Sequence, residues 1–162
     1  MATVIVALGS NIGDRQQHLV DAKSFLADFS SSEITVSSLY LTEPIGPATR
    51  DFYNAVVVLT TDVKPHALIN KFKRFEAEHG RANDHPKWSA RTIDLDIIGY
   101  DDLVIQTDTL IIPHREYEER LFVLVPLMEV CPSWEDPKSG QTIENLIEQA
   151  PAMRLEKTAI HW

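Results

Sequence analysis

The chain has 162 residues, of which 44% are hydrophobic and 24% charged, and its formal net charge is −9. This composition is typical of one globular domain, and the acidic balance argues against a general nucleic-acid binder, which carries a basic face. No apolar run is long enough to span a bilayer, and the N-terminus lacks the basic flank of a signal peptide. A single cysteine, Cys131, rules out an internal disulfide. We therefore expect one cytoplasmic domain, residues 1–162.

The first half of the chain contains three runs typical of β-strands and one pattern typical of a helix. The strands are predicted at residues 3–8, 33–41 and 53–61. A turn at 9–13 separates the first strand from the helix, which Asp14 can cap, with Gln17 three residues later as in a capping box. Two prolines and a glycine make residues 42–51 a loop, longer than a tight hairpin needs.

The middle of the chain predicts a second helix and a fourth strand. Pro65 begins the helix and Gly80 ends it, and a polar loop at 81–91 leads into a strand at 92–100. The resulting order, β-α-β-β-α-β, predicts an α+β fold of the ferredoxin-like type, an antiparallel sheet with helices on one face. Additional C-terminal elements are predicted as helices at 124–130 and 142–149 and a strand at 154–162.

The strongest chemical signal is a pair of carboxylates, Asp94 and Asp96, in the fourth strand. Because side chains alternate along a strand, the two aspartates share one face, with Cα atoms about 6.6 Å apart, while Ile93, Leu95 and Ile97 point into the core. Carboxylates this close repel each other unless a cation lies between them. Mg²⁺ prefers such oxygen ligands and completes its shell with water and phosphate. The competing interpretation is a solvated strand face.

The loop before this strand carries Arg81, Trp88 and Arg91. The arginine fork of donors suits phosphate oxygens, so the loop is typical of a lid over a triphosphate. A solvated basic loop is the alternative. Phe52 and Asn54 share a face at the start of the third strand, where a flat ligand can stack on the ring while the amide binds its edge. Taken alone, Phe52 is more often a core residue.

Together these segments resemble the 6-hydroxymethyl-7,8-dihydropterin pyrophosphokinase family, from Ala7 to about Pro132. The shared residues are Ala7-Leu8-Gly9-Ser10-Asn11, Thr42-Glu43-Pro44-Ile45-Gly46-Pro47, Phe52-Tyr53-Asn54, Glu76, Gly80-Arg81, Trp88, Arg91-Thr92-Ile93-Asp94-Leu95-Asp96, Pro113-His114 and Arg120-Leu121-Phe122. The family has a ferredoxin-like fold and is usually monomeric. It transfers a pyrophosphoryl group from ATP to a reduced pterin alcohol, giving AMP and the pterin diphosphate in folate biosynthesis. The resemblance implies these properties here, with two Mg²⁺ ions as cofactor and neither nucleic-acid nor membrane partners.

The resemblance also implies roles for individual residues. The catalytic residues would be Arg81, Arg91, Asp94 and Asp96, of which the two aspartates hold the metal ions. The pterin would be bound by Thr42, Pro44, Ile45, Phe52, Asn54, Trp88 and Phe122, with the two phenylalanines on either side of the ring. ATP would be bound by Lys73, Glu76, Ile97, Leu110, His114 and Arg120.

The polar loop departs from the family pattern. Ser89-Ala90 stands where the family usually has Gly-Pro, and Asn83 stands where a second arginine is common. These changes concern the ATP side and the lid. They leave open a paralogue that acts on a related pterin, or a protein that binds pterin or nucleotide with little turnover. An RNA-binding module would need exposed aromatic residues on its central strands and a basic face, whereas these strands carry valine, isoleucine and aspartate.

Overall fold

The computed structural model describes residues 1–44, 50–79 and 92–162. The protein is an α+β fold built on a six-stranded sheet in the order β5-β1-β4-β3-β8, in which β2 also pairs with β4. All pairings in the sheet are antiparallel. Its strands are β1 (Ala2–Ser10), β2 (Thr35–Val36), β3 (Tyr40–Thr42), β4 (Phe52–Thr61), β5 (Asp94–Tyr100) and β8 (Leu155–Lys157). A separate hairpin consists of β6 (Ile105–Gln106) and β7 (Ile111–Ile112).

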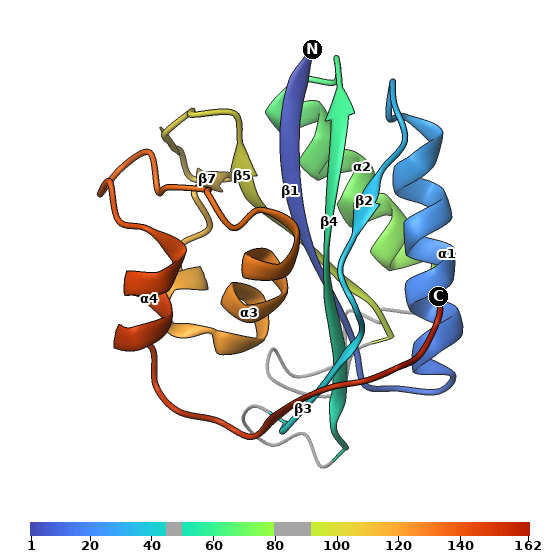
Figure 1. The fold of residues 1–162 in the computed structure, drawn as a ribbon. Helices are drawn as coiled ribbons and strands as arrows, with labels where there is room; N and C mark the ends of the chain where they lie inside the picture. The colour runs from blue at the N-terminus through green and yellow to red at the C-terminus, as the bar shows by residue number, and fades with distance from the viewer. Residues whose placement is uncertain (45–49, 80–91) are drawn as a thin grey trace.

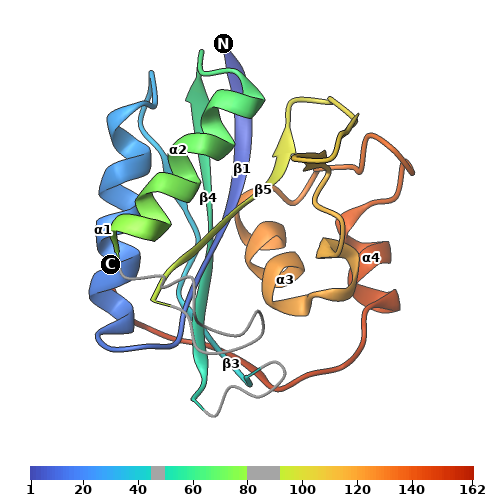
Figure 2. The same ribbon diagram turned by 180° about the vertical axis from the view of Figure 1, so that it is seen from behind.

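Helices cover both faces of the sheet (Figures 1 and 2). The helices are α1 (Arg15–Asp28), α2 (Pro65–Glu78), α3 (Leu121–Val130) and α4 (Ile143–Gln149), with a short 3₁₀ helix, η1 (Tyr117–Glu119). One core joins Val4 and Val6 of β1 to Leu19 of α1 and Phe72 of α2. A second core joins the opposite face of the sheet to α3 and α4. The prediction of helices on one face therefore holds for α1 and α2, while the C-terminal helices cover the other face.

The predicted strand at 33–41 is wrong as one continuous element, because it divides into β2 and β3. The cause is Ser37, whose N–H donates to the Val56 carbonyl (2.9 Å) while its own hydroxyl accepts from the Val56 N–H (2.9 Å). A side-chain oxygen thus replaces a backbone carbonyl in the ladder, an alternative that serine offers readily. The next residue, Ser38, directs its N–H toward Glu129 of α3.

Helix boundaries also differ from the pattern. Asp14 accepts a hydrogen bond from the Gln17 N–H (3.1 Å) and caps α1 as predicted. The Gln17 side chain donates to Asp21, one turn further along the helix, and this contact is not the return bond of a capping box. α3 begins at Leu121 rather than 124, so Pro126 lies inside it. Within the described residues, no helix is long and apolar enough to cross a membrane.

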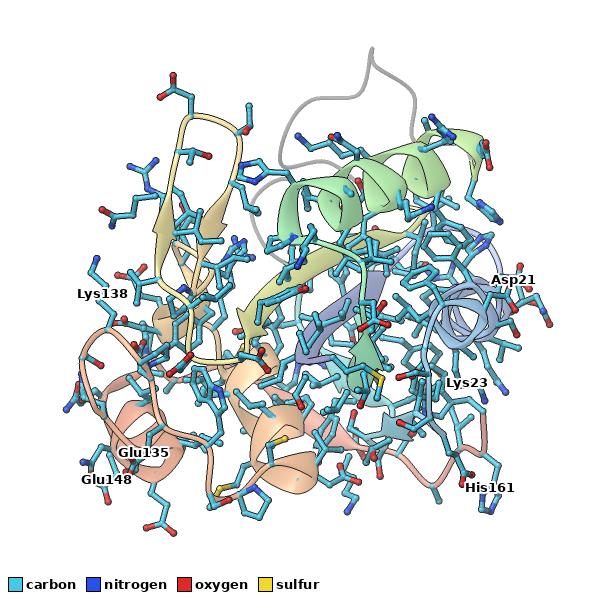
Figure 3. All side chains as sticks on the ribbon, turned by 90° about the horizontal axis from the view of Figure 1, so that it is seen from above. Asp21, Lys23, Glu135, Lys138, Glu148 and His161 are labelled. Carbon is cyan, nitrogen blue, oxygen red and sulfur yellow. The ribbon has the colours of Figure 1, made fainter. Side chains whose placement is uncertain are left out.

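The C-terminal tail pairs with the sheet edge beside the start of β4. β8 pairs with β3 as the predicted added strand, and Arg154 forms two hydrogen bonds with the Asp51 carboxylate (2.8 and 2.9 Å). The chain then ends beside α1, where Lys23 lies 5.2 Å from the Trp162 ring centroid (Figure 1). Charged side chains occupy the outer surfaces of both helical layers, such as Lys23 on one side and Glu148 on the other (Figure 3).

Candidate active site

The central strands place three predicted site residues, Asn54, Asp94 and Asp96, close together on the sheet. Gly9 of β1 pairs with Asn54 of β4 on one side and with Asp94 of β5 on the other. Ala7, two residues earlier, pairs in the same way with Asp96. Directly paired residues of antiparallel strands point to the same face. Asn54 and both aspartates therefore lie on the face that α3 covers, with only a glycine and an alanine between the amide and the carboxylates.

Gly9 is a candidate site residue that the sequence reasoning missed, because it was assigned to a turn. A Cβ added at Gly9 would lie 2.6 Å from Asn54 Oδ1, closer than real Cβ contacts. The Asn54 amide is fixed from its other end, where Nδ2 donates to Thr42 Oγ1 (2.7 Å), and both residues are buried. The available signal was the presence of small residues, Ala7 and Gly9, at alternate positions of a strand that is otherwise rich in valine and isoleucine.

Two predicted aromatic residues lie on the same side of the sheet as the amide. Phe52 begins β4, two residues before Asn54, and is half-buried. Phe122 lies in the first turn of α3 and packs against the second core, with the Arg120 guanidinium carbon 5.6 Å from its ring centroid. Pro44, two residues after β3, is also half-buried. Two aromatic rings and a proline beside a buried amide can enclose a flat polar ligand.

The carboxylate pair alternates with buried apolar residues, as predicted. Leu95 and Ile97 are 2% exposed and belong to the first core, whereas the Asp96 side chain is 40% exposed. His114 Nε2 lies 3.8 Å from Asp96 Oδ1. Burial lowers the pKa of His114, an effect that the Asp96 carboxylate opposes only in part.

The carboxylates of Asp94 and Asp96 suit a cation whose other ligands are water and phosphate oxygens. Within residues 1–44, 50–79 and 92–162, no group of three or more histidine, cysteine, aspartate or glutamate side chains could hold a metal ion. Two carboxylates on one strand face are too few for an all-protein site. They fit Mg²⁺, which commonly binds one or two carboxylates and fills its other positions with water and phosphate oxygens.

A cavity of about 240 Å³ lies beside Asp96, between α2, β5 and the β6–β7 hairpin. Ile97 and Leu110 give it an apolar wall, and Lys73 and His114 give it polar groups. These are four of the six residues predicted to bind ATP. Sequence reasoning missed Thr107 and Arg115, which also line the cavity.

The other two residues predicted to bind ATP, Glu76 and Arg120, do not line this cavity. Glu76 is 6% exposed, and its Oε2 accepts from the Leu95 N–H (2.9 Å), so it holds β5 between the two aspartates. Arg120 forms an ion pair with Glu116 (2.7 Å). Several predicted or discussed residues lie outside the described residues: Ile45, Arg81, Asn83, Trp88, Ser89, Ala90 and Arg91.

Comparison with known proteins decides the family. The family model for 7,8-dihydro-6-hydroxymethylpterin-pyrophosphokinase matches residues 5–132. The chain belongs to this family. It is 40% identical over 146 residues to the 2-amino-4-hydroxy-6-hydroxymethyldihydropteridine pyrophosphokinase of Synechocystis, covering 90% of this chain and 74% of the relative. It is 37% identical over 151 residues to the enzyme of the same name from Haemophilus influenzae, covering 92% and 93%.

Solved structures show a similar fold at low sequence identity. One chain of Plasmodium falciparum HPPK-DHPS has a TM-score of 0.70 with this protein at 16% identity. The match covers 91% of this chain and 44% of the solved chain, so this protein spans less than half of that larger one. The likeness supports the α+β architecture alone.

Proposed function

We infer that this protein transfers a pyrophosphoryl group from ATP to the hydroxymethyl group of 6-hydroxymethyl-7,8-dihydropterin, giving AMP and the pterin diphosphate of folate biosynthesis. The family assignment supports the reaction. One structural observation carries the argument: Asn54, Gly9 and Asp94 are directly paired across three strands, so a group that binds the amide lies beside the carboxylates. We propose that the enzyme acts as a cytoplasmic monomer, and that its strand order corresponds to a ferredoxin-like sheet.

The pterin binds on the face beneath α3. Asn54 presents an amide whose orientation Thr42 fixes, and an amide offers both a donor and an acceptor to the edge of a heterocycle. Phe52 and Phe122 flank the ring, and such aromatic pairs contribute about 0.5–1.5 kcal/mol each beyond area burial. Pro44, Ile45 and Trp88 complete the site.

ATP binds in the cavity beside Asp96. A volume of about 240 Å³ is below the roughly 300–1,000 Å³ of whole-ligand pockets, so the cavity holds the base while the phosphates extend along β5. Ile97 and Leu110 contact the base. Lys73, His114 and Arg120 contact the sugar and phosphates, with Arg81 and Arg91 from the preceding loop. Burial lowers the pKa of His114 and so favours the neutral imidazole, which can act as a hydrogen-bonding group.

The two carboxylates hold the cation beside the reacting groups. Two Mg²⁺ ions bound there would neutralise charge on the phosphates and orient them for in-line transfer. The chain itself supplies rigidity: Glu76 fixes the Leu95 N–H from behind, and Ile97 anchors the strand in the core. Pre-positioning of this kind lowers the barrier without a covalent enzyme intermediate.

Product analysis tests this proposal. The protein is incubated with ATP, Mg²⁺ and 6-hydroxymethyl-7,8-dihydropterin, and the nucleotide and pterin products are separated by chromatography. We expect AMP and pterin diphosphate in equal amounts. Formation of ADP, or binding of both ligands without any product, would contradict the proposed reaction and favour a binding protein.

A further inference from the structure

Glu129, near the end of α3, accepts a concentrated set of hydrogen bonds from the segment that precedes the site. The Ser38 N–H lies 3.1 and 3.0 Å from its two carboxylate oxygens, and the Ser38 hydroxyl donates to Oε2 (2.9 Å). The Tyr40 hydroxyl donates to Oε1 (2.7 Å). These contacts join residues about 90 positions apart, one on the helix and the others at the start of β3.

On the strand side, the contacts lead directly to the Asn54 amide. Tyr40 pairs with Asn54 across β3 and β4, and Thr42, two residues further along the same strand, accepts the amide hydrogen bond. β3 has only three residues, which pair with β4 on one side and with β8 on the other. A carboxylate that holds its first residue therefore helps to fix the amide.

On the helix side, the contacts lead to Phe122. Seven residues separate Phe122 from Glu129, which is about two turns, so both lie on the same face of α3. Pro126 lies between them and has no N–H to donate to the Phe122 carbonyl four residues earlier. The first turn of α3 is thus tied less firmly to the rest of the helix, and contacts between helix and sheet matter more for the position of the Phe122 ring.

We propose that Glu129 is a positioning residue for the pterin site, holding the α3 helix that carries Phe122 against the β3 strand that orients Asn54. The inference rests on the proposed function, because it assumes that Phe122 and Asn54 bind the same ligand. Apolar packing of Val123, Leu124 and Leu127 in the second core keeps α3 on the sheet without this carboxylate. Loss of Glu129 is therefore expected to alter the spacing of the site rather than to unfold the protein.

Two substitutions separate geometry from charge. Glu129→Ala removes every acceptor, and we expect pterin binding to weaken about 10-fold, or about 1.4 kcal/mol. Glu129→Gln keeps one acceptor for Ser38, and its amide can donate to the Tyr40 oxygen once that hydroxyl rotates. We expect the Gln variant to bind pterin within about 3-fold of wild type, half a log unit or about 0.7 kcal/mol. ATP affinity stays unchanged in both.

Tyr40→Phe and Tyr117→Phe form a matched pair. Each removes one hydroxyl of a buried tyrosine that donates to a carboxylate, that of Glu129 or that of Asp136, on the same side of the sheet, and the Tyr40 contact is the more exposed of the two. Only the Tyr40 variant should weaken pterin binding. Equal losses in both variants would mean that pterin affinity follows general stability, and this would overturn the proposal.

A double-mutant cycle with Phe122→Ala gives the decisive readout, with pterin and ATP affinities measured separately by calorimetry. If Glu129 acts through the Phe122 ring, the double variant loses less affinity than the product of the single losses. Multiplicative losses, or a Glu129→Ala variant that binds pterin like wild type, would refute the positioning role. Failure of the wild-type protein to bind pterin would instead refute the proposed function.

Discussion

Substitution of Gly9 by alanine should damage the pterin site through one methyl group. The new Cβ would lie 2.6 Å from Asn54 Oδ1, where an ordinary contact is 3.4–4 Å, so the amide must move by roughly the difference of 0.8 Å or more. Thr42 blocks a simple retreat, because the Asn54 Nδ2 already lies 2.7 Å from its hydroxyl in a buried setting. The amide must therefore rotate, and its hydrogen bond to Thr42 breaks or lengthens.

The magnitude follows from opposing effects. Loss of the hydrogen-bond partner of a buried amide lowers the free energy of unfolding by about 1–3 kcal/mol. Replacing glycine by alanine raises it by about 0.4–1 kcal/mol, because the unfolded chain has fewer conformations to lose on folding. We expect a net stability loss of about 1 kcal/mol, with pterin affinity falling by about 1–3 kcal/mol because the ligand loses its oriented amide. ATP affinity should not change, since the nucleotide cavity lies beside Asp96 and excludes Gly9.

Gly99→Ala is the matched control. Gly99 lies on the same face of the sheet, where it pairs with Ile5, and a Cβ there would meet Trp134 and Ile5 at ordinary distances of 3.5 and 3.6 Å. This variant should be as stable as wild type or slightly more stable, with normal pterin binding. Urea denaturation and calorimetry on each ligand measure both quantities. If Gly9→Ala behaves like Gly99→Ala, the reasoning about the amide is wrong.

Three further outcomes are expected. Phe122→Ala should weaken pterin binding by about 1–3 kcal/mol through lost burial and stacking, with calorimetry showing no change for ATP; equal loss for both ligands would indicate a disturbed fold. Lys73→Ala should weaken ATP binding and leave pterin binding intact, and unchanged ATP affinity would remove the cavity from the nucleotide site. Burial raises the pKa of Glu129, but hydrogen bonds from Tyr40 and Ser38 outweigh burial and hold it below 4.5. The folding stability that Glu129 contributes is therefore present above pH about 4.5 and is lost as the pH falls through the lower folded value. In urea denaturation, the advantage of wild type over Glu129→Gln should shrink on acidification, and a constant difference would contradict this.

Local patterns predicted the parts of the fold that depend on neighbouring residues. The alternation around Leu95 and Ile97 gave the correct face for the carboxylates, and Asp14 gave the start of α1. The division at Ser37 was not predictable, because a serine hydroxyl replaces a ladder carbonyl only when a particular partner, Val56, lies opposite.

The site itself was predicted in part. Its chemically distinctive residues, such as Asp96 and Asn54, have recognisable functional groups. The roles of Gly9 and Glu129 depend on register and on contacts between distant segments, which periodicity does not encode. The functional roles of all these residues, Arg81 and Arg91 included, stay predictions.

The most direct test of the account is the rate of AMP formation by Asp94→Asn and Asp96→Asn beside the wild-type enzyme. Each substitution keeps size and removes one carboxylate charge from the shared strand face. The Asp96→Asn variant should melt at the wild-type temperature or slightly above it, because repulsion between the two carboxylates is relieved. Turnover should fall by at least about 100-fold, the scale seen when one key electrostatic partner is removed. Stable variants that form AMP and pterin diphosphate at nearly the wild-type rate would show that the carboxylate pair is only a solvated strand face, and would contradict the mechanism.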